Sequence, residues 1–134
     1  MNRQFVFSVI VLFVVTLVMG YLIHGALLFD DYAALPNIMR TQEETQALFP
    51  FMVLAHLSVA IGLTWIYRMG RTEGAEWIGQ GVRFGLAIAV VSTIPFFMIY
   101  YVVQQTPEAL AIKQIAFESV TMIGIGMLTA FMNR

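Results

Sequence analysis

Cysteine is absent from this chain of 134 residues, and charged side chains are few. The absence of cysteine excludes disulfides, thiolate metal sites, thiol catalysis and lipidation at a cysteine. Charged residues make up 11% of the chain, against about 25% in an ordinary soluble domain. Nucleic-acid binding relies on clustered Lys and Arg. The net charge of −1 therefore gives no reason to predict a nucleic-acid partner.

Long apolar stretches fill most of the sequence. Hydrophobic residues make up 60% of it, mainly in four runs: Phe5–Phe29, Ala47–Met69, Trp77–Val103 and Pro107–Met132. A helix needs about 20 residues, at about 1.5 Å each, to cross a bilayer core of ~30 Å. The first run is also far longer than the ~7–15 apolar residues of a signal peptide. We therefore expect an all-α polytopic membrane protein: one domain over residues 1–134, folded in the lipid bilayer as an antiparallel bundle of four transmembrane helices.

The distribution of charge predicts the orientation of these helices. With an even number of spans, both termini lie on one side. That side carries five arginines against two glutamates: Arg3, Arg68, Arg71, Arg83 and Arg134 against Glu73 and Glu76. The other side, formed mainly by an outer loop over residues 30–46, is acidic. Because Lys and Arg concentrate in cytoplasmic loops, we expect a multi-pass protein of the cell inner membrane with both termini in the cytoplasm.

Local signals predict helix starts and interface residues. Thr41 and Glu44 fit a capping box, so the second helix is expected to begin ahead of Pro50. Aromatic residues near span ends are typical of belts at the membrane interfaces. The inner belt would comprise Trp65, Tyr67 and Trp77, and the outer belt Tyr21, Tyr32, Tyr100 and Tyr101. The charged ends of Lys113 and Arg83 are expected to extend toward water.

Small residues and one proline indicate how the helices pack. Gly81 and Gly85 form a small-xxx-small pattern in the third span, and Ser58 and Gly62 form one in the second. Such patterns let two helix backbones approach closely, either within one chain or between copies of it. Pro95 is expected to kink the third span, because proline lacks an N–H and displaces the carbonyl four residues before it.

Five polar residues inside the spans are the candidates for chemistry. At about 1.5 Å per residue, Glu118 lies ~16 Å deep, His56 ~14 Å and His24 ~8 Å from the outer face. Gln114 and Thr121 share a helix face with Glu118. The pattern predicts a polar intramembrane cluster, in which His56 is the expected partner of Glu118. The cluster is either a proton-active or ligand-binding site, or a neutral Glu118 that hydrogen bonds to a neighbouring helix.

The two histidines are poor evidence for a cofactor. Haem ligation by His24 and His56 would need both imidazoles on one iron, and a depth difference of ~6 Å makes that awkward. No spacing within one helix is typical of metal ligands. We therefore predict no metal site and no resident cofactor, with haem or quinone as an alternative.

The run from Gly20 to Phe29, followed by an acidic outer loop, resembles the first-helix signature of small bacterial four-helix membrane proteins of the DUF1761 type. The layout of residues 81–98 and 124–134 is similar to theirs. The resemblance implies a four-helix fold and no established activity.

No catalytic residue is predicted in this sequence. We expect a non-catalytic accessory or interaction protein of the inner membrane, associated with copies of itself or with other membrane subunits. One alternative is a small binding or redox subunit that seats a quinone, a haem or another apolar ligand near His24, His56 and Glu118. Another is a small proton-coupled carrier.

Overall fold

Helices form all the regular structure of the described residues, 2–35 and 38–134, in the computed structural model. The order is α1 (Arg3–Gly20), the π-helix η1 (Tyr21–Leu27), α2 (Phe29–Ala33), α3 (Gln42–Gly70), α4 (Trp77–Ile88), the π-helix η2 (Ala89–Thr93), α5 (Ile94–Val103) and α6 (Glu108–Met132). Four continuous helical segments are long and apolar enough to cross a membrane: Arg3–Leu27, Gln42–Gly70, Trp77–Val103 and Glu108–Met132. The predicted all-α class and the four apolar helices are confirmed.

Side-chain caps explain where two of these helices begin. The predicted capping box is present at α3: Thr41 Oγ1 accepts from the Glu44 N–H at 3.2 Å, and Glu44 Oε2 accepts from the Thr41 N–H at 2.9 Å. Helix α3 therefore begins ahead of the apolar run and continues through Pro50. At α4, the Glu76 carboxylate accepts from the N–H groups of Ile78 and Gly79. Both caps satisfy donors that a helix start leaves free.

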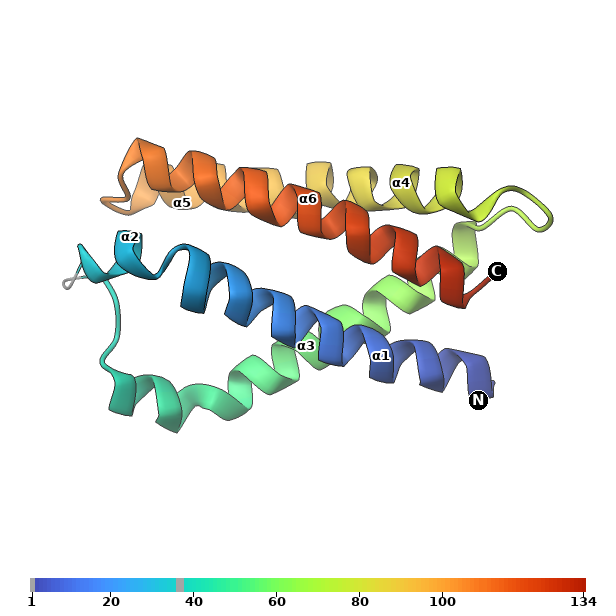
Figure 1. Cartoon of the computed structure of the whole chain (residues 1–134), viewed down its shortest axis with the longest axis horizontal. Helices are drawn as coiled ribbons and strands as arrows, with labels where there is room; N and C mark the ends of the chain where they lie inside the picture. The colour runs from blue at the N-terminus through green and yellow to red at the C-terminus, as the bar shows by residue number, and fades with distance from the viewer. Residues whose placement is uncertain (1, 36–37) are drawn as a thin grey trace.

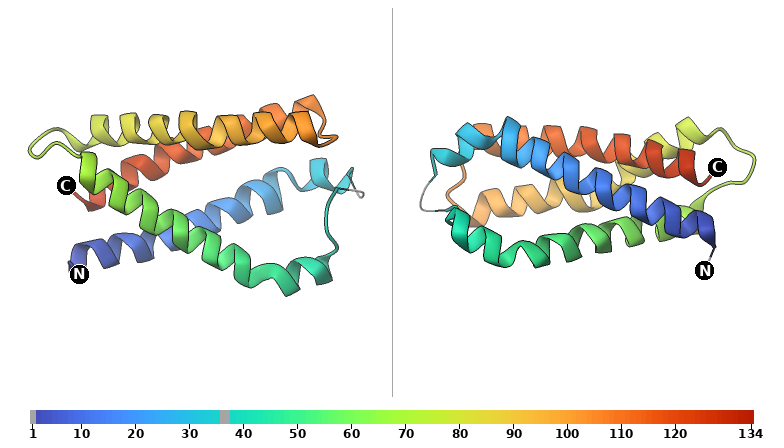
Figure 2. Two further views of the ribbon diagram at one scale, coloured as in Figure 1. Left: turned by 180° about the vertical axis from the view of Figure 1, so that it is seen from behind. Right: turned by 60° about the horizontal axis from the view of Figure 1, so that its bottom comes forward.

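The helices differ in how closely they pack against one another. Figure 1 shows α6 beside α4 and α5, with the chain reversing after α5. Helix α1 crosses α3 and also packs on α6, while the first half of α3 diverges from α1 (Figures 1 and 2). The N- and C-termini lie at one end of the molecule, which we call the terminus end. The other end, where α2 meets the turn between α5 and α6, is the α2 end.

Glycines bring α4 and α6 into backbone contact. A Cβ on Gly85 would lie 2.5 Å from the Met122 carbonyl oxygen, and a Cβ on Gly81 would lie 2.6 Å from the Met127 Cα. Gly126 faces them from α6, where a Cβ would meet the Gly81 carbonyl oxygen at 2.5 Å. The small-residue pattern of this span is thus used within one chain.

Ser58 and Gly62 make no comparable contact. A Cβ on Gly62 would have no neighbour within 4 Å among the described residues. The Ser58 hydroxyl is exposed and donates to the Leu54 carbonyl of its own helix at 2.8 Å. This face of α3 is therefore open in the single chain.

The helix that contains Pro95 changes its winding instead of ending there. The five residues of η2 lie directly ahead of α5, in which Pro95 occupies the first turn. A π turn absorbs the carbonyl that proline displaces. The Ser92 hydroxyl donates to the Ile88 carbonyl at 2.7 Å within this region.

Two apolar clusters hold the helices together. One joins α1, α3 and α6 through Val9, Leu12, Ala60, Leu63 and Ile125. A smaller one, at the α2 end, joins η1 to α6 through Ile23, Leu28 and Leu110. Many other large apolar side chains face outward, and Val102, Val91 and Met69 are 81%, 77% and 71% exposed. In water such a surface would be costly.

Candidate functional site

A chain of hydrogen bonds joins three elements at the α2 end. His24 comes from η1, Tyr32 from α2, and Gln114 and Glu118 lie one turn apart on α6. His24 Nε2 lies 2.8 Å from Glu118 Oε1, and His24 Nδ1 lies 2.6 Å from the Tyr32 hydroxyl. Gln114 Nε2 donates to the same hydroxyl at 3.0 Å. We call His24, Tyr32, Gln114 and Glu118 the polar cluster.

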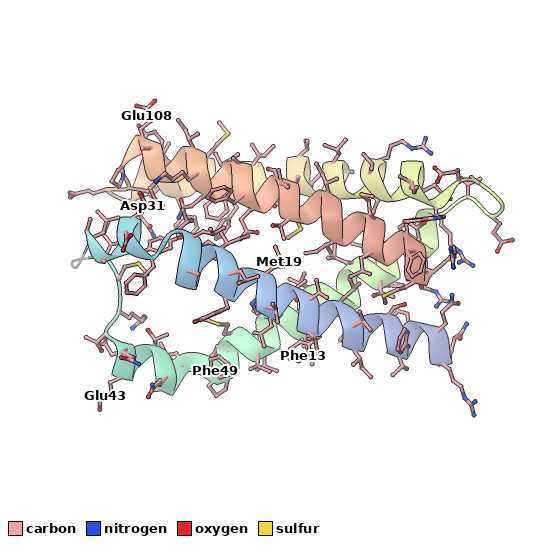
Figure 3. All side chains as sticks on the ribbon, in the orientation of Figure 1. Phe13, Met19, Asp31, Glu43, Phe49 and Glu108 are labelled. Atoms are coloured by element: carbon pink, nitrogen blue, oxygen red, sulfur yellow. The ribbon has the colours of Figure 1, made fainter. Side chains whose placement is uncertain are left out.

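Local structure explains why these side chains meet. A π-helix carries one extra residue in its turn, so η1 rotates His24 relative to the face that α1 presents. Gly25 makes room for the Tyr21 ring, since a Cβ there would lie 2.9 Å from Tyr21 Cδ2. Helix α2 is anchored on α6 by the Lys113–Asp31 ion pair, whose Nζ–Oδ1 distance is 2.8 Å. Figure 3 shows Asp31 on α2, Glu108 on α6 and Glu43 on α3 at this end of the molecule.

The chemistry of the four side chains determines which of them donates and which accepts each hydrogen bond. If Glu118 is ionised it can only accept, and the Nε2–H of a neutral His24 then donates to it. Nδ1 is then the acceptor and receives the Tyr32 O–H, and the Tyr32 oxygen accepts from Gln114. Burial raises the pKa of the Tyr32 phenol; the Gln114 hydrogen bond lowers it, and Glu118 and Asp31 raise it further. The phenol therefore keeps the proton that this arrangement needs.

A cavity of about 270 Å³ adjoins the polar cluster. His24, Tyr32 and Gln114 line one part of it. The remaining lining residues are Leu35, Ile38, Met39, Gln104, Thr106 and Leu110. The side chains of His24 and Glu118 are 37% and 15% exposed, so the pair is partly shielded while His24 borders the cavity. Ligand sites commonly combine an apolar lining with a few convergent polar groups.

The structure brings together three of the five predicted polar residues and adds one. His24, Gln114 and Glu118 belong to the polar cluster. His56 packs over Gly20 of α1, where a Cβ would be 3.3 Å from His56 Cε1. No hydrogen bond joins His56 or Thr121 to the cluster among the described residues. Tyr32, which the sequence suggested as part of an aromatic belt, is the shared partner of His24 and Gln114.

The partner of Glu118 is His24, where depth along the helices suggested His56. Depth counted at a fixed rise per residue leaves out helix tilt, rotation and side-chain reach. The π turn changes the rotation at His24, and the His56 ring packs over Gly20 where α1 crosses α3. In residues 2–35 and 38–134, no three His, Asp or Glu side chains gather as a metal-ligand set.

No protein-family profile matches this chain, and neither the curated proteins nor the solved structures contain a significant match.

Proposed function

We propose that this chain is an integral protein of the bacterial inner membrane, an antiparallel four-helix bundle with both termini in the cytoplasm. The outward-facing apolar side chains and the four long helices support insertion. Arginines of α3, α4 and both chain ends lie at the terminus end, whereas Asp31, Glu43 and Glu108 lie at the α2 end (Figure 3). This asymmetry supports the orientation.

Single cysteines test that orientation in a chain that has none. Gln42→Cys lies at the α2 end and Ala75→Cys in the turn between α3 and α4, and both positions are exposed. With an impermeant thiol reagent on intact cells, Gln42→Cys should be labelled and Ala75→Cys only after permeabilisation. The reverse pattern would refute the orientation. If neither cysteine is labelled after permeabilisation, neither position is accessible to water, which would contradict the proposal.

The function we propose is non-catalytic binding of a small, neutral, amphipathic ligand at the α2 end. The observation that carries it is the cavity of about 270 Å³ bordered by the polar cluster. Gln104, Thr106 and Gln114 provide amide and hydroxyl groups for a carbonyl or hydroxyl headgroup. Leu35, Met39 and Leu110 provide apolar walls for a ring or a short chain. A quinone headgroup has this chemistry and serves as the probe.

Equilibrium binding of decylubiquinone to the purified protein tests the ligand class. Gln114→Leu removes an amide from the cavity wall and should weaken binding about tenfold, a change typical of losing one or two hydrogen bonds. Thr121→Val alters the same helix outside the cavity and should bind like the unmodified chain. Saturable binding that is lost in the first variant alone supports the proposal. Absence of saturable binding, or equal loss in both variants, excludes it.

The His24–Glu118 contact favours proton coupling as a second function. If His24 gains a proton, Nδ1 becomes a donor and no longer accepts the Tyr32 O–H. The Tyr32 proton is then free for a ligand in the adjoining cavity. Asp31 and Lys113, which bind each other at 2.8 Å, lie on the two elements that carry Tyr32 and Glu118. Proton uptake on ligand binding, measured with a pH dye in weak buffer, should disappear in Glu118→Gln.

We also propose that the chain associates with other membrane chains and that it is similar to the DUF1761 type. The glycines of α4 already contact α6 within the chain. The open small-residue face of α3, with Ser58 and Gly62, is the surface that suits a second copy or another membrane subunit. Crosslinking through Ser58→Cys in membranes should give a dimer, and Val102→Cys on α5 should not.

A further inference from the structure

A second cavity lies at the terminus end, between the end of α3 and the start of α4. Its volume is about 330 Å³. Ile66, Tyr67, Gly70, Arg71, Thr72, Gln80, Arg83 and Phe84 line it. A neighbouring hollow of about 340 Å³ shares Tyr67, Arg71, Thr72 and Gln80 with it. We call the first of these the arginine cavity.

Two arginines line the arginine cavity: Arg83 of α4, and Arg71, which directly follows the last residue of α3. Arg83 Nε donates to the Gly79 carbonyl at 3.3 Å, and this bond uses neither terminal nitrogen of the guanidinium. Arg71 donates through one terminal nitrogen to the backbone carbonyl of Asn133. Its other terminal nitrogen lies 3.7 Å from Glu73, a carboxylate that is 89% exposed and therefore strongly screened. No carboxylate is among the residues that line the arginine cavity, all of which the structure describes.

Tyr67 places a phenol at the arginine cavity. Only 4% of this residue is exposed, and it lines both hollows. Its ring packs edge-on against Phe84 at 5.3 Å between centroids. The hydroxyl makes no hydrogen bond with any residue in the described part of the chain. The hydroxyl oxygen is not one of the enclosed side-chain atoms that lack a partner, so it is open to the hollows and can donate to a ligand there.

The wall of the cavity is held in place by the turn that follows α3. Gln80 Oε1 accepts from the Thr72 N–H at 2.7 Å, and Gln80 Nε2 donates to the carbonyls of Thr72 and Ala75. Gly74, at φ 76°, allows the tight reversal of the chain in this turn. The turn therefore holds Thr72 against Gln80 of α4, in the wall that Arg71 and Arg83 also line.

We propose that the arginine cavity binds the phosphate of an anionic phospholipid headgroup. Arginine forks match phosphate oxygens through paired hydrogen bonds, and the Tyr67 hydroxyl adds a further donor. Ile66 is 50% exposed beside the cavity and offers an apolar path for an acyl chain. The same phosphate chemistry could come from a soluble phosphate ester. The inference rests on the membrane insertion proposed above but is independent of the ligand cavity at the α2 end.

Binding of a fluorescent phosphatidylglycerol to the purified full chain in neutral detergent micelles tests this site. Arg83→Gln should weaken binding about tenfold or more, because it removes a charged donor pair. Tyr67→Phe should weaken it about threefold, because it removes one neutral donor. Arg3→Gln is the matched control: it removes an exposed arginine at the same end, away from the cavity, and should change binding less than twofold. Thermal melting of each variant checks that the fold is retained.

Competing ligands identify the source of the phosphate. Phosphatidylcholine, whose choline would lie beside the arginines, should compete at least several-fold less well. Displacement by glycerol 1-phosphate would assign the site to a soluble ester, and failure to displace would assign it to lipid; both results keep a phosphate site. Equal losses in Arg83→Gln and Arg3→Gln, or equal binding of both phospholipids, would overturn the proposal. Decylubiquinone binding in the same samples shows separately whether the α2-end site is intact.

Discussion

The polar groups that join the helices differ between the two ends of the molecule. At the terminus end the central group is a neutral amide, whereas at the α2 end the groups are ionisable. Asn133 is fully buried, and its amide donates to the Ser8 hydroxyl at 3.1 Å and to the Thr129 carbonyl at 2.9 Å. Gln4 adds a bond to the Met132 carbonyl. At the α2 end, His24 and Glu118 join the helices, and His24 also lines a cavity.

This difference indicates that the two ends have different roles: the terminus end stabilises the fold, and the α2 end binds a ligand. Neutral amides that are fully hydrogen bonded join α1 and α6 without a change of charge, so this joint is insensitive to protons. An imidazole–carboxylate pair can exchange a proton, and its imidazole, His24, borders space that a ligand can enter. The comparison predicts that changes at the terminus end lower stability, while changes in the polar cluster alter binding.

The largest effect is expected where α4 touches α6. Gly85→Ala places a Cβ 2.5 Å from the Met122 carbonyl oxygen and should destabilise the fold by about 3 kcal/mol, since the helices must move apart. Gly62→Ala, with open space around it, is the matched control and should be neutral or slightly stabilising. Thermal melting in detergent measures both. Similar melting temperatures for the two variants would show that the close backbone contact is unimportant.

A somewhat smaller loss is expected for Asn133→Leu. The substitution leaves the buried Ser8 hydroxyl without the Asn133 amide, while the Thr129 carbonyl keeps the backbone N–H of residue 133 as a donor. It should cost about 2 kcal/mol, in the range for unsatisfied buried groups. Decylubiquinone binding at the α2 end should stay within twofold of the unmodified chain. A parallel loss of quinone affinity at temperatures where the variant is folded would contradict the division between the two ends.

Glu118→Gln should change stability little. Glutamine keeps a side-chain oxygen that accepts from His24 Nε2, so the contact between η1 and α6 is retained. The melting temperature should fall by no more than a few degrees, while the proton uptake that accompanies ligand binding is abolished. If the melting temperature collapses instead, the carboxylate is needed chiefly to hold the helices together.

The smallest effect concerns Tyr32 at alkaline pH. Its pKa is raised in the folded state, chiefly by burial, so ionisation is harder there than in the unfolded chain. This contribution to stability is present below the ordinary phenol value of about 10 and is lost as pH rises through the folded pKa. Melting between pH 9 and 11.5 should therefore fall less steeply in Tyr32→Phe. Tyr21→Phe, at a residue that is 70% exposed, should follow the unmodified chain.

Hydropathy was sufficient to predict the four helices, because span length and apolar content are properties of single segments. The pairing of side chains depends on how segments rotate and cross. The π turn at Tyr21–Leu27 and the crossing of α1 over α3 decide that Glu118 meets His24 and that His56 packs on Gly20. Asn133 lies outside every predicted span, and nothing in its neighbours indicates that it becomes buried between Ser8 and Thr129.

The sequence also did not predict that Tyr32 belongs to the polar cluster. An aromatic residue after a span is typical of an interface belt, and this pattern does not distinguish it from a cluster member. Only the short helix α2, folded back on α6 through the Asp31–Lys113 pair, brings its hydroxyl to His24 and Gln114. Acidic Asp31 and basic Lys113 could have suggested this contact, since they are opposite charges near the same membrane face.

The central claim is that the polar cluster serves binding and does not hold the fold. His24→Gln tests it most directly, with decylubiquinone affinity and melting temperature measured on the same preparation. Glutamine retains a donor for Glu118 but removes the imidazole that accepts from Tyr32 and borders the cavity. The account predicts at least about tenfold weaker binding with a melting temperature within a few degrees of the unmodified chain. Unchanged affinity with a large fall in melting temperature would contradict it.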